Sequence, residues 1–332
     1  MVTDYSLQGV EGVVVEAVAE SVLPVAPARR TGVVGWTAAL VSAAAFGTSG
    51  AFAKPLLASG WSAGAVVAVR LGLAAAVLLV PGLIALRRRW RLLLDHWRPL
   101  LCYGVFGGAT AQVGFFNAVH HVPVALGILL EYLGILLVVC WVALRTRRLP
   151  SRLTVLGVVT AIAGLVIVLD PASMGGLDLR GIAWGLLATF GLAVYFVVSA
   201  QPMTLPPLTF VAVGLTIGTI AILVAALAGL MPLQAATADV SFAGLDLPWW
   251  VPLLELALVA AAAAYALGFV GVQHLGSTVA SFVGLTEVLF AAGWAWLLLG
   301  ELTGLPQLAG GVILLAGVAI VQRGQSGEQQ PS

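Results

Sequence analysis

Long apolar stretches that are almost free of charge dominate this sequence. A helix that crosses a bilayer needs about 20 mostly apolar residues, and ten windows of roughly this kind are present. Prolines such as Pro123, Pro150 and Pro171 separate several of them, as is typical of turns. The pattern predicts an all-α polytopic membrane protein with ten transmembrane helices, at residues 32–53, 63–86, 99–119, 122–144, 153–169, 181–200, 208–230, 249–272, 276–299 and 304–321.

The composition excludes several other classes of protein. Of the 332 residues, 61% are hydrophobic and 9% are charged, and the mean hydropathy is +1.08. A soluble domain has about 25% charged residues, so this chain could not cover a water-facing surface. The 15 Lys and Arg residues are balanced by 14 Asp and Glu residues, which leaves no basic surface for a nucleic acid. The expected partners are therefore a lipid bilayer and a small molecule.

The positive charges are concentrated in alternate connections between the windows. With the N-terminus inside, 2 of them (Lys54 and Arg180) fall on the outer side and 12 on the inner side. Cytoplasmic loops carry the excess of Lys and Arg, so we expect both termini in the cytoplasm of a bacterial inner-membrane protein. The inner residues are Arg29, Arg30, Arg87, Arg88, Arg89, Arg91, Arg98, Arg145, Arg147, Arg148, Arg152 and Arg323.

Residue spacings in the first half recur in the second half. A glutamate precedes a proline by 19 residues in both halves, at Glu131–Pro150 and at Glu287–Pro306. Two glycines are 7 residues apart in both halves, at Gly157–Gly164 and at Gly310–Gly317. Each half contains five windows, and an odd number places the second half upside down in the membrane. Inverted repeats of this kind are typical of transporters with a site near the midplane.

The repeats define the expected organisation of the chain. An N-terminal cytoplasmic tail without regular order precedes the first repeat, and a short cytoplasmic tail follows the second. The expected boundaries are 1–30 for the N-terminal tail, 31–170 and 178–322 for the repeats, and 323–332 for the C-terminal tail.

Four charged residues lie inside the windows, namely Arg70, Glu131, Glu255 and Glu287. An ionisable side chain in hydrocarbon costs about 2.5–3.5 kcal/mol on insertion scales, so each is a candidate for function. Arg70 and Glu131 have similar expected depths, and a structural ion pair between them would offset part of this cost. Glu255 is close to the outer end of its window, where its side chain could reach the interface.

Small residues flank both Glu131 and Glu287 on one helical face. Gly127 and Gly134 lie four residues before and three after Glu131, and Gly284 and Ala291 lie three before and four after Glu287. Small residues are typical of faces that pack against other helices, so we expect both carboxylates to point inward. Each is either a substrate or proton site, or a structural carboxylate bonded to a neighbouring helix.

Uncharged polar residues add further candidates for a substrate site. Gln112 and Asn117 belong to the third window, and Gln112 aligns with Tyr265 in the second repeat. Tyr132 and Tyr195 offer hydroxyl groups on aromatic side chains. Such groups suit a cavity for a small amphiphilic solute, although a buried tyrosine is also an ordinary core residue.

Motifs for metals, cofactors and enzymatic chemistry are not found. The histidines His96, His120, His121 and His274 do not have the spacing of a metal site on one helix. No phosphate-binding loop of the G-x-x-x-x-G-K-[ST] type occurs, which excludes a built-in ATP motor. We therefore expect neither a cofactor nor an enzyme.

Several segments resemble the EamA-type branch of the drug/metabolite transporter superfamily, and within it the bacterial threonine/homoserine exporter group. The most specific is the run from Val122 to Gly134, which contains Glu131. Relatives often have proline where this chain has Ile135 and Val288, a difference that affects helix kinks. The other similar segments are Ala51-Phe52-Ala53-Lys54-Pro55-Leu56, Val69-Arg70-Leu71-Gly72-Leu73, Leu101-Cys102-Tyr103-Gly104-Val105 and Leu299-Gly300-Glu301.

The resemblance implies ten helices in two inverted five-helix repeats and the export of small metabolites. Our first hypothesis is proton-driven export of amino acids or related compounds, in which Glu131 exchanges a proton for a substrate ammonium. The alternatives are export of lipophilic cations or drugs by the same carboxylate, and a membrane scaffold or sensor that transports nothing. A homodimer is compatible with each of them.

Overall fold

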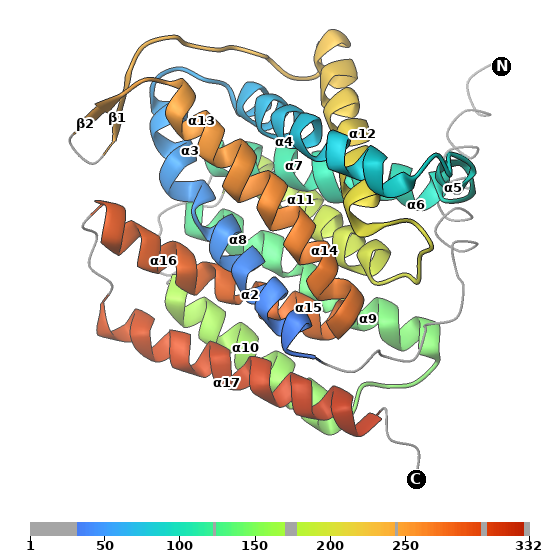
Figure 1. Cartoon of the computed structure of the whole chain (residues 1–332). Helices are drawn as coiled ribbons and strands as arrows, with labels where there is room; N and C mark the ends of the chain where they lie inside the picture. The colour runs from blue at the N-terminus through green and yellow to red at the C-terminus, as the bar shows by residue number, and fades with distance from the viewer. Residues whose placement is uncertain (1–31, 122–123, 170–177, 243–244, 300–303, 329–332) are drawn as a thin grey trace, which may run out of the picture.

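The computed structural model describes residues 32–121, 124–169, 178–242, 245–299 and 304–328, and nearly all of this part is helical. Figure 1 shows the helices gathered side by side in one bundle. The elements of the first half are α2 Val33–Gly47, α3 Ser49–Ala58, α4 Ala63–Leu86, α5 Arg91–Asp95, α6 Trp97–Cys102, the π-helical η1 Tyr103–Thr110, α7 Ala111–His121, α8 Val124–Tyr132, α9 Gly134–Thr146 and α10 Arg152–Leu169.

The second half adds a hairpin to a similar series of helices. Strands β1 and β2 pair in antiparallel fashion in the connection between α12 and α13. The elements are α11 Leu179–Ser199, α12 Pro207–Leu227, β1 Val240–Phe242, β2 Leu245–Leu247, α13 Trp250–Ala257, the π-helical η3 Leu258–Ala263, α14 Ala264–Leu275, α15 Ser277–Gly284, α16 Thr286–Leu299 and α17 Leu305–Glu328.

Eight helical segments of the described residues are long and apolar enough to cross a membrane, which makes the protein a multi-pass membrane protein. Two shorter apolar helices, at residues 152–167 and 308–324, fall outside this set. The second expected window, 63–86, coincides with α4. The last helix, α17, continues to Glu328, so the expected C-terminal tail from residue 323 is partly helical. The expected N-terminal tail lies outside the described residues.

Helices of the two halves pack in pairs. The contacting pairs are α2 with α14, α4 with α12, α7 with α11 and α10 with α17. In the two repeats α2 corresponds to α11, α7 to α14, α4 to α12 and α10 to α17. If each helix is replaced by its counterpart, the pair α2–α14 becomes α11–α7, and the pairs α4–α12 and α10–α17 are unchanged. The packing therefore has the pseudo-twofold pattern that a duplicated five-helix unit produces.

The glycines that revealed the repeat lie at one of these contacts. Helices α10 and α17 run side by side (Figure 1). A Cβ on Gly157 would lie 3.0 Å from the carbonyl oxygen of Gly317, and a Cβ on Gly164 would lie 2.8 Å from that of Gly310. The two pairs with matching intervals therefore pack against each other, and they allow the backbones to approach closely.

Several expected helices are interrupted. The first window divides at Thr48 between α2 and α3, the fourth divides at Leu133, and the ninth divides at Leu285. The third and eighth each contain a π-helical segment, which frequently marks a functional site. Leu133 and Leu285 are not helix breakers themselves, but a glycine lies beside each of them, Gly134 and Gly284.

The long connection after α12 packs over one end of the bundle. The indole Nε1 of Trp61 donates to the carbonyl of Ala236 at 2.7 Å, and the rings of Phe52 and Phe242 stack with centroids 4.9 Å apart. This connection forms part of the folded structure, and the hydropathy pattern contained no sign of its hairpin.

Candidate functional site

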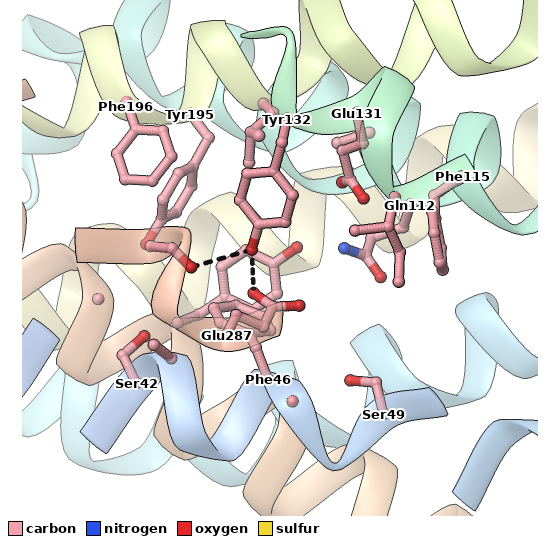
Figure 2. A pocket seen from close by; sticks show the side chains of 18 of the residues that line it. Ser42, Phe46, Ser49, Gln112, Phe115, Glu131, Tyr132, Tyr195, Phe196 and Glu287 are labelled. Atoms are coloured by element: carbon pink, nitrogen blue, oxygen red, sulfur yellow. Dashed lines mark hydrogen bonds between the residues drawn. The ribbon is translucent and has the colours of Figure 1, made fainter. Parts of the chain in front are cut away.

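A cavity of about 130 Å³ lies between the two halves of the bundle. Both halves contribute: one side is provided by α2, α3, α4, η1, α7 and α8, and the other by α11, α14, α15 and α16. Figure 2 shows side chains from these helices converging on it. Its polar lining residues are Ser42, Ser49, Arg70, Gln112, Glu131, Tyr132, Tyr195, Tyr265 and Glu287.

Most of the candidates inferred from the sequence thus meet in one place. Asn117 is the exception, because it does not line the cavity. Its Nδ2 instead donates to the carbonyl of Val113 at 2.8 Å, one turn earlier on the same helix. This bond stays within the helix, so Asn117 has no visible role in the site.

Arg70 is the most deeply buried charged side chain of the cavity, with 1% of its surface exposed. Its Nη1 donates to Oε1 of Gln112 at 3.0 Å, and its Nη2 donates to the carbonyl of Ala260 in the π-helical segment η3 at 2.5 Å. Arg70 therefore joins α4 to α7 and to η3.

The expected ion pair between Arg70 and Glu131 is not formed in the part of the chain that the structure describes. The guanidinium group bonds to Gln112 and Ala260 instead. Glu131 is still close enough to interact with Arg70 and Glu287 electrostatically. Figure 2 shows its carboxylate pointing into the same space as the side-chain amide of Gln112. The similar depth expected in the membrane did not identify the bonded partner of Arg70.

Glu287 has the most direct polar contact across the two halves. The hydroxyl of Tyr132 lies 2.8 Å from Oε2 of Glu287 and 3.1 Å from the carbonyl oxygen of Gly284 (Figure 2). Tyr132 belongs to α8 in the first half, whereas Gly284 and Glu287 flank the break between α15 and α16. Glu287 also occupies the first turn of α16, where the helix dipole favours a negative charge.

The two helix breaks are stabilised by hydroxyl groups from the opposite half. Thr189 of α11 donates to the carbonyl of Leu130 at 2.5 Å, next to the break at Leu133. Tyr132 contacts the carbonyl of Gly284, next to the break at Leu285. Interrupted helices at corresponding positions of two repeats are a common setting for transporter sites. Here each break lies within two residues of a carboxylate of the cavity.

Aromatic rings form much of the remaining wall. Tyr195 and Tyr265 have ring centroids 5.8 Å apart, and Tyr103, which does not itself line the cavity, packs with its ring centroid 5.6 Å from that of Tyr195. Tyr103 was missed by sequence reasoning. Its hydroxyl is buried and has no hydrogen-bond partner among the described residues. The neighbouring Gly104, which packs against α12, was the available signal that this helical face is internal.

Glu255 does not reach the interface as its position in the window had indicated. Its Oε1 accepts a hydrogen bond from Thr48 at 2.5 Å, and Thr48 is the residue at the break between α2 and α3. Its Oε2 is buried and has no hydrogen-bond partner in the described chain. Glu255 also interacts electrostatically with Arg70, although it does not line the cavity.

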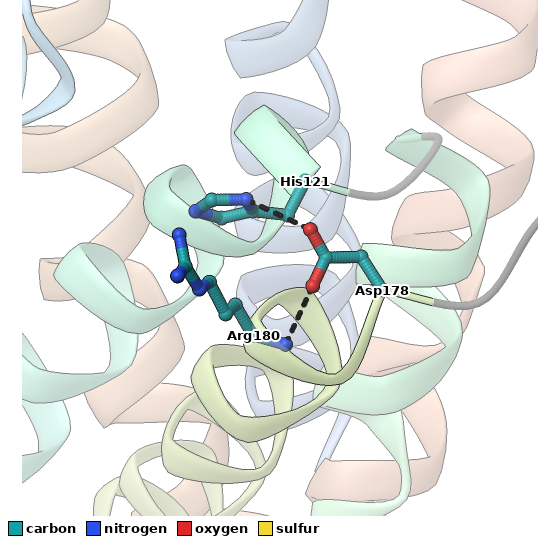
Figure 3. A network of polar contacts seen from close by, with 3 residues as sticks. All are labelled: His121, Asp178 and Arg180. Atoms are coloured by element: carbon teal, nitrogen blue, oxygen red, sulfur yellow. Dashed lines mark hydrogen bonds and ion pairs between the residues drawn. The ribbon is translucent and has the colours of Figure 1, made fainter.

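A second polar contact lies at the ends of α7 and α11, away from the cavity. Nδ1 of His121 is 3.2 Å from Oδ2 of Asp178, and the backbone N–H of Arg180 donates to Oδ1 of Asp178 at 2.8 Å (Figure 3). This N–H bond and the nearby imidazole lower the pKa of Asp178. Asp178 thereby caps the start of α11. The described residues contain no group of three or more side chains that could hold a metal ion.

A polar cavity enclosed by interrupted helices of two related halves is the architecture of a membrane transporter. The chain belongs to the EamA-like transporter family, whose model matches residues 33–170 and again residues 179–323. The double match agrees with the two repeats seen in the sequence, and it supports a protein that transports a solute and is not an enzyme.

Comparison with known proteins gives the same picture. The chain is 24% identical over 228 residues to the uncharacterized inner membrane transporter YicL of Salmonella typhimurium, across 67% of this chain and 72% of that protein. A solved crystal structure with 18% sequence identity superposes with a TM-score of 0.69, across 86% of this chain and 95% of the other. At this identity the second likeness shows the fold alone.

Proposed function

We propose that the protein is a secondary exporter of small amine-bearing metabolites, such as amino acids, driven by exchange with protons. The observation that carries this proposal is the charge composition of the cavity. Two carboxylates, Glu131 and Glu287, face it, and Arg70 is the cation among its lining residues. Ionisation of both carboxylates leaves one negative charge uncompensated in a low-dielectric region. A proton or a substrate ammonium group can compensate that charge in turn.

The position of Glu131 favours it as the residue that meets the substrate. Its carboxylate lines the cavity, whereas the carboxylate of Glu287 is already in contact with Tyr132. Gln112 and the nearby tyrosines supply further groups that can bind a small polar solute. In this proposal Glu131 releases a proton when the substrate ammonium binds, and takes one up again after the substrate leaves.

The architecture proposed with this function has ten spanning helices in two inverted repeats. Helices α10 and α17 would then be the fifth and tenth spans, and their mutual contact supports assigning them equivalent positions. The positive charges of the connections support cytoplasmic termini in a bacterial inner membrane. The run from Val122 to Gly134 supports placement close to the threonine/homoserine exporters.

Export of lipophilic cations is a second candidate, and the aromatic wall of the cavity favours it. Aromatic faces attract cations, particularly when water is excluded. Phe46, Phe115 and Phe196 line the cavity together with its tyrosines. A lipophilic cation would contact the aromatic rings over much of its surface, whereas a compact polar amine would contact mainly the polar groups. A panel that contains both kinds of solute therefore discriminates between the two functions.

The test is efflux from proteoliposomes that contain the purified protein, with a panel of amino acids, other amines and lipophilic cations. An imposed pH gradient should accelerate the efflux of at least one amine. Glu131→Gln should remove most of this acceleration because glutamine keeps the size of the side chain but cannot bind and release a proton. Glu255→Gln is the matched control, since Glu255 is a buried carboxylate that does not line the cavity.

Protein amount and melting temperature are measured for each variant, so that misfolding is recognised. Parent-like efflux by Glu131→Gln, with the same response to the gradient, would show that Glu131 is structural. The absence of flux for every solute would favour the scaffold or sensor hypothesis.

A further inference from the structure

The hydroxyl of Tyr132 has one hydrogen and two neighbours that can accept it. The carbonyl oxygen of Gly284 lies at 3.1 Å and can only accept. Oε2 of Glu287 lies at 2.8 Å and accepts when the carboxylate is ionised, but donates when it carries a proton. The direction of these two hydrogen bonds therefore depends on the protonation of Glu287.

We propose that Tyr132 transmits the protonation of Glu287 to the break between α15 and α16. With Glu287 protonated, its O–H donates to the Tyr132 oxygen, and the Tyr132 O–H donates to the Gly284 carbonyl. With Glu287 ionised, its proton has passed into the cavity that it lines, and the Tyr132 O–H turns to the carboxylate. The Gly284 carbonyl then loses its donor.

The carbonyl of Gly284 is sensitive to this loss because of its position. In a continuous α-helix it would accept from the N–H of Val288. Here that N–H donates to the carbonyl of Leu285 at 3.2 Å instead. A buried carbonyl that loses its hydrogen-bond donor is costly, so loss of the Tyr132 bond favours a rearrangement of the break. The contact between the two halves at this point therefore depends on one proton.

The corresponding break in the first half has no such dependence. The carbonyl of Leu130 accepts from Thr189, whose hydroxyl donates at 2.5 Å and also lies 2.9 Å from the carbonyl of Gly185. Among the described residues, the hydrogen bonds of this threonine go to backbone carbonyls and not to an ionisable side chain. The two halves are therefore related in backbone architecture but differ in chemistry, and only the second break is linked to a carboxylate.

Other charged groups around Glu287 set the conditions for this exchange. Helix α2, which packs against α16, has no titratable side chain, and α3 brings Lys54. The further titratable residues of the helices packed against α15 and α16 are Cys140 and Arg145 on α9, Arg180 on α11, His274 on α14, and Arg323 and Glu328 on α17. The groups that interact with Glu287 electrostatically are Arg70, Glu131, Tyr132, Tyr195 and Tyr265.

This inference rests on the proton coupling proposed above, but it is tested without transport. Helices α9 and α15 are in contact, and spin labels on Leu144→Cys and Ser277→Cys report the distance between them. The native Cys102 and Cys140 are replaced by serine. Distance distributions are measured on samples frozen at a series of pH values in lipid nanodiscs.

We expect the distribution of the parent to shift between acidic and alkaline pH. Glu287→Gln should hold it at the acidic position, because the glutamine N–H can donate to Tyr132 as the protonated acid does. Tyr132→Phe should hold it at the alkaline position, because the Gly284 carbonyl has no donor at any pH. Thr189→Val is the control that should retain the shift. Glu131→Gln should retain it with a different midpoint, because Glu131 interacts with Glu287 electrostatically.

A parent distribution that does not change with pH would overturn the proposal. A shift that persists in Glu287→Gln, or a Tyr132→Phe variant that behaves like the parent, would overturn it equally. If the distances behave as expected but Glu131→Gln retains full proton-driven efflux, the proposed role of Glu131 fails and the role of Tyr132 stands.

Discussion

Replacing Arg70 with methionine removes the cation that joins three helices at the centre of the bundle. The guanidinium group donates to Gln112 at 3.0 Å and to the Ala260 carbonyl at 2.5 Å. A hydrogen bond to a charged group contributes about 1.5–3 kcal/mol. Two such bonds, taken near the lower end for a helical membrane protein, predict a loss of about 3 kcal/mol in the free energy of unfolding.

The second half of the experiment identifies the partner of Arg70. Gln112→Leu should lower the free energy of unfolding of the parent by more than about 1 kcal/mol. In the Arg70→Met background the loss should be much smaller, because the guanidinium group that donates to Gln112 is already absent. Glu131→Gln should show a smaller coupling to Arg70→Met, since no hydrogen bond joins the two side chains among the described residues. Arg70→Lys keeps the charge without the planar fork and should fall between the parent and Arg70→Met.

The assay is reversible unfolding in mixed micelles of mild and denaturing detergent, with the helical signal followed by circular dichroism. A loss below about 1 kcal/mol for Arg70→Met would refute the bonding scheme. Additive effects of Arg70→Met and Gln112→Leu, with strong coupling to Glu131→Gln, would restore the direct ion pair that the sequence had suggested.

Three further predictions concern packing, pH and topology. A Cβ on Gly134 would lie 2.5 Å from the carbonyl oxygen of Thr189, whereas one on Gly293 would meet nothing within 4 Å. In the same unfolding assay Gly134→Ala should therefore lower the free energy of unfolding by about 1–3 kcal/mol. Gly293→Ala is the matched control and should be neutral or stabilising. The pKa of Asp178 is lower in the folded protein than in the unfolded chain, so its ionised form stabilises the fold. This stabilisation is complete at pH values above the ordinary aspartate pKa, and it is lost as the pH falls through the lowered pKa of the folded protein. Asp178→Ala should accordingly lower the melting temperature at neutral pH, with a difference that narrows in acid, and Asp178→Asn should restore much of the cap. A reporter active only in the periplasm should be silent when fused after Arg323, and strong activity would contradict cytoplasmic termini.

The helices could be predicted from the sequence because a bilayer leaves the backbone few alternatives. Every peptide group in hydrocarbon must find its partner internally, so length and hydropathy nearly suffice to place a spanning helix. The window at 63–86 coincides with α4 for this reason. The breaks at Leu133 and Leu285 were not predicted. The carbonyls of Leu130 and Gly284 beside them accept from Thr189 and Tyr132 of the opposite half, and hydropathy does not show such contacts.

The members of the site were predictable, whereas their partners were not. A polar side chain within an apolar window is conspicuous in any sequence, which is why Glu131, Gln112 and Glu287 were recognised as candidates. The pairing of Arg70 with Glu131 was inferred from the expected depth of each residue along its helix. Depth alone does not say which neighbouring helix a side chain faces. The side chain that accepts from Arg70 is set by which helix face meets the guanidinium group, and that face carries Gln112.

The balance of charge around Arg70 connects the cavity to the helix breaks. Three carboxylates, Glu131, Glu255 and Glu287, interact electrostatically with this one guanidinium group. A single positive charge cannot compensate all three when they are ionised, so we expect the two that line the cavity, Glu131 and Glu287, to bind protons or cations as their surroundings change. Each of the three lies within two residues of a break or accepts a hydrogen bond from a residue at one. In the exchange proposed here, movement at a break would alter the environment of a charge, and binding of a cation would alter the stability of a break, so the two would be coupled reciprocally.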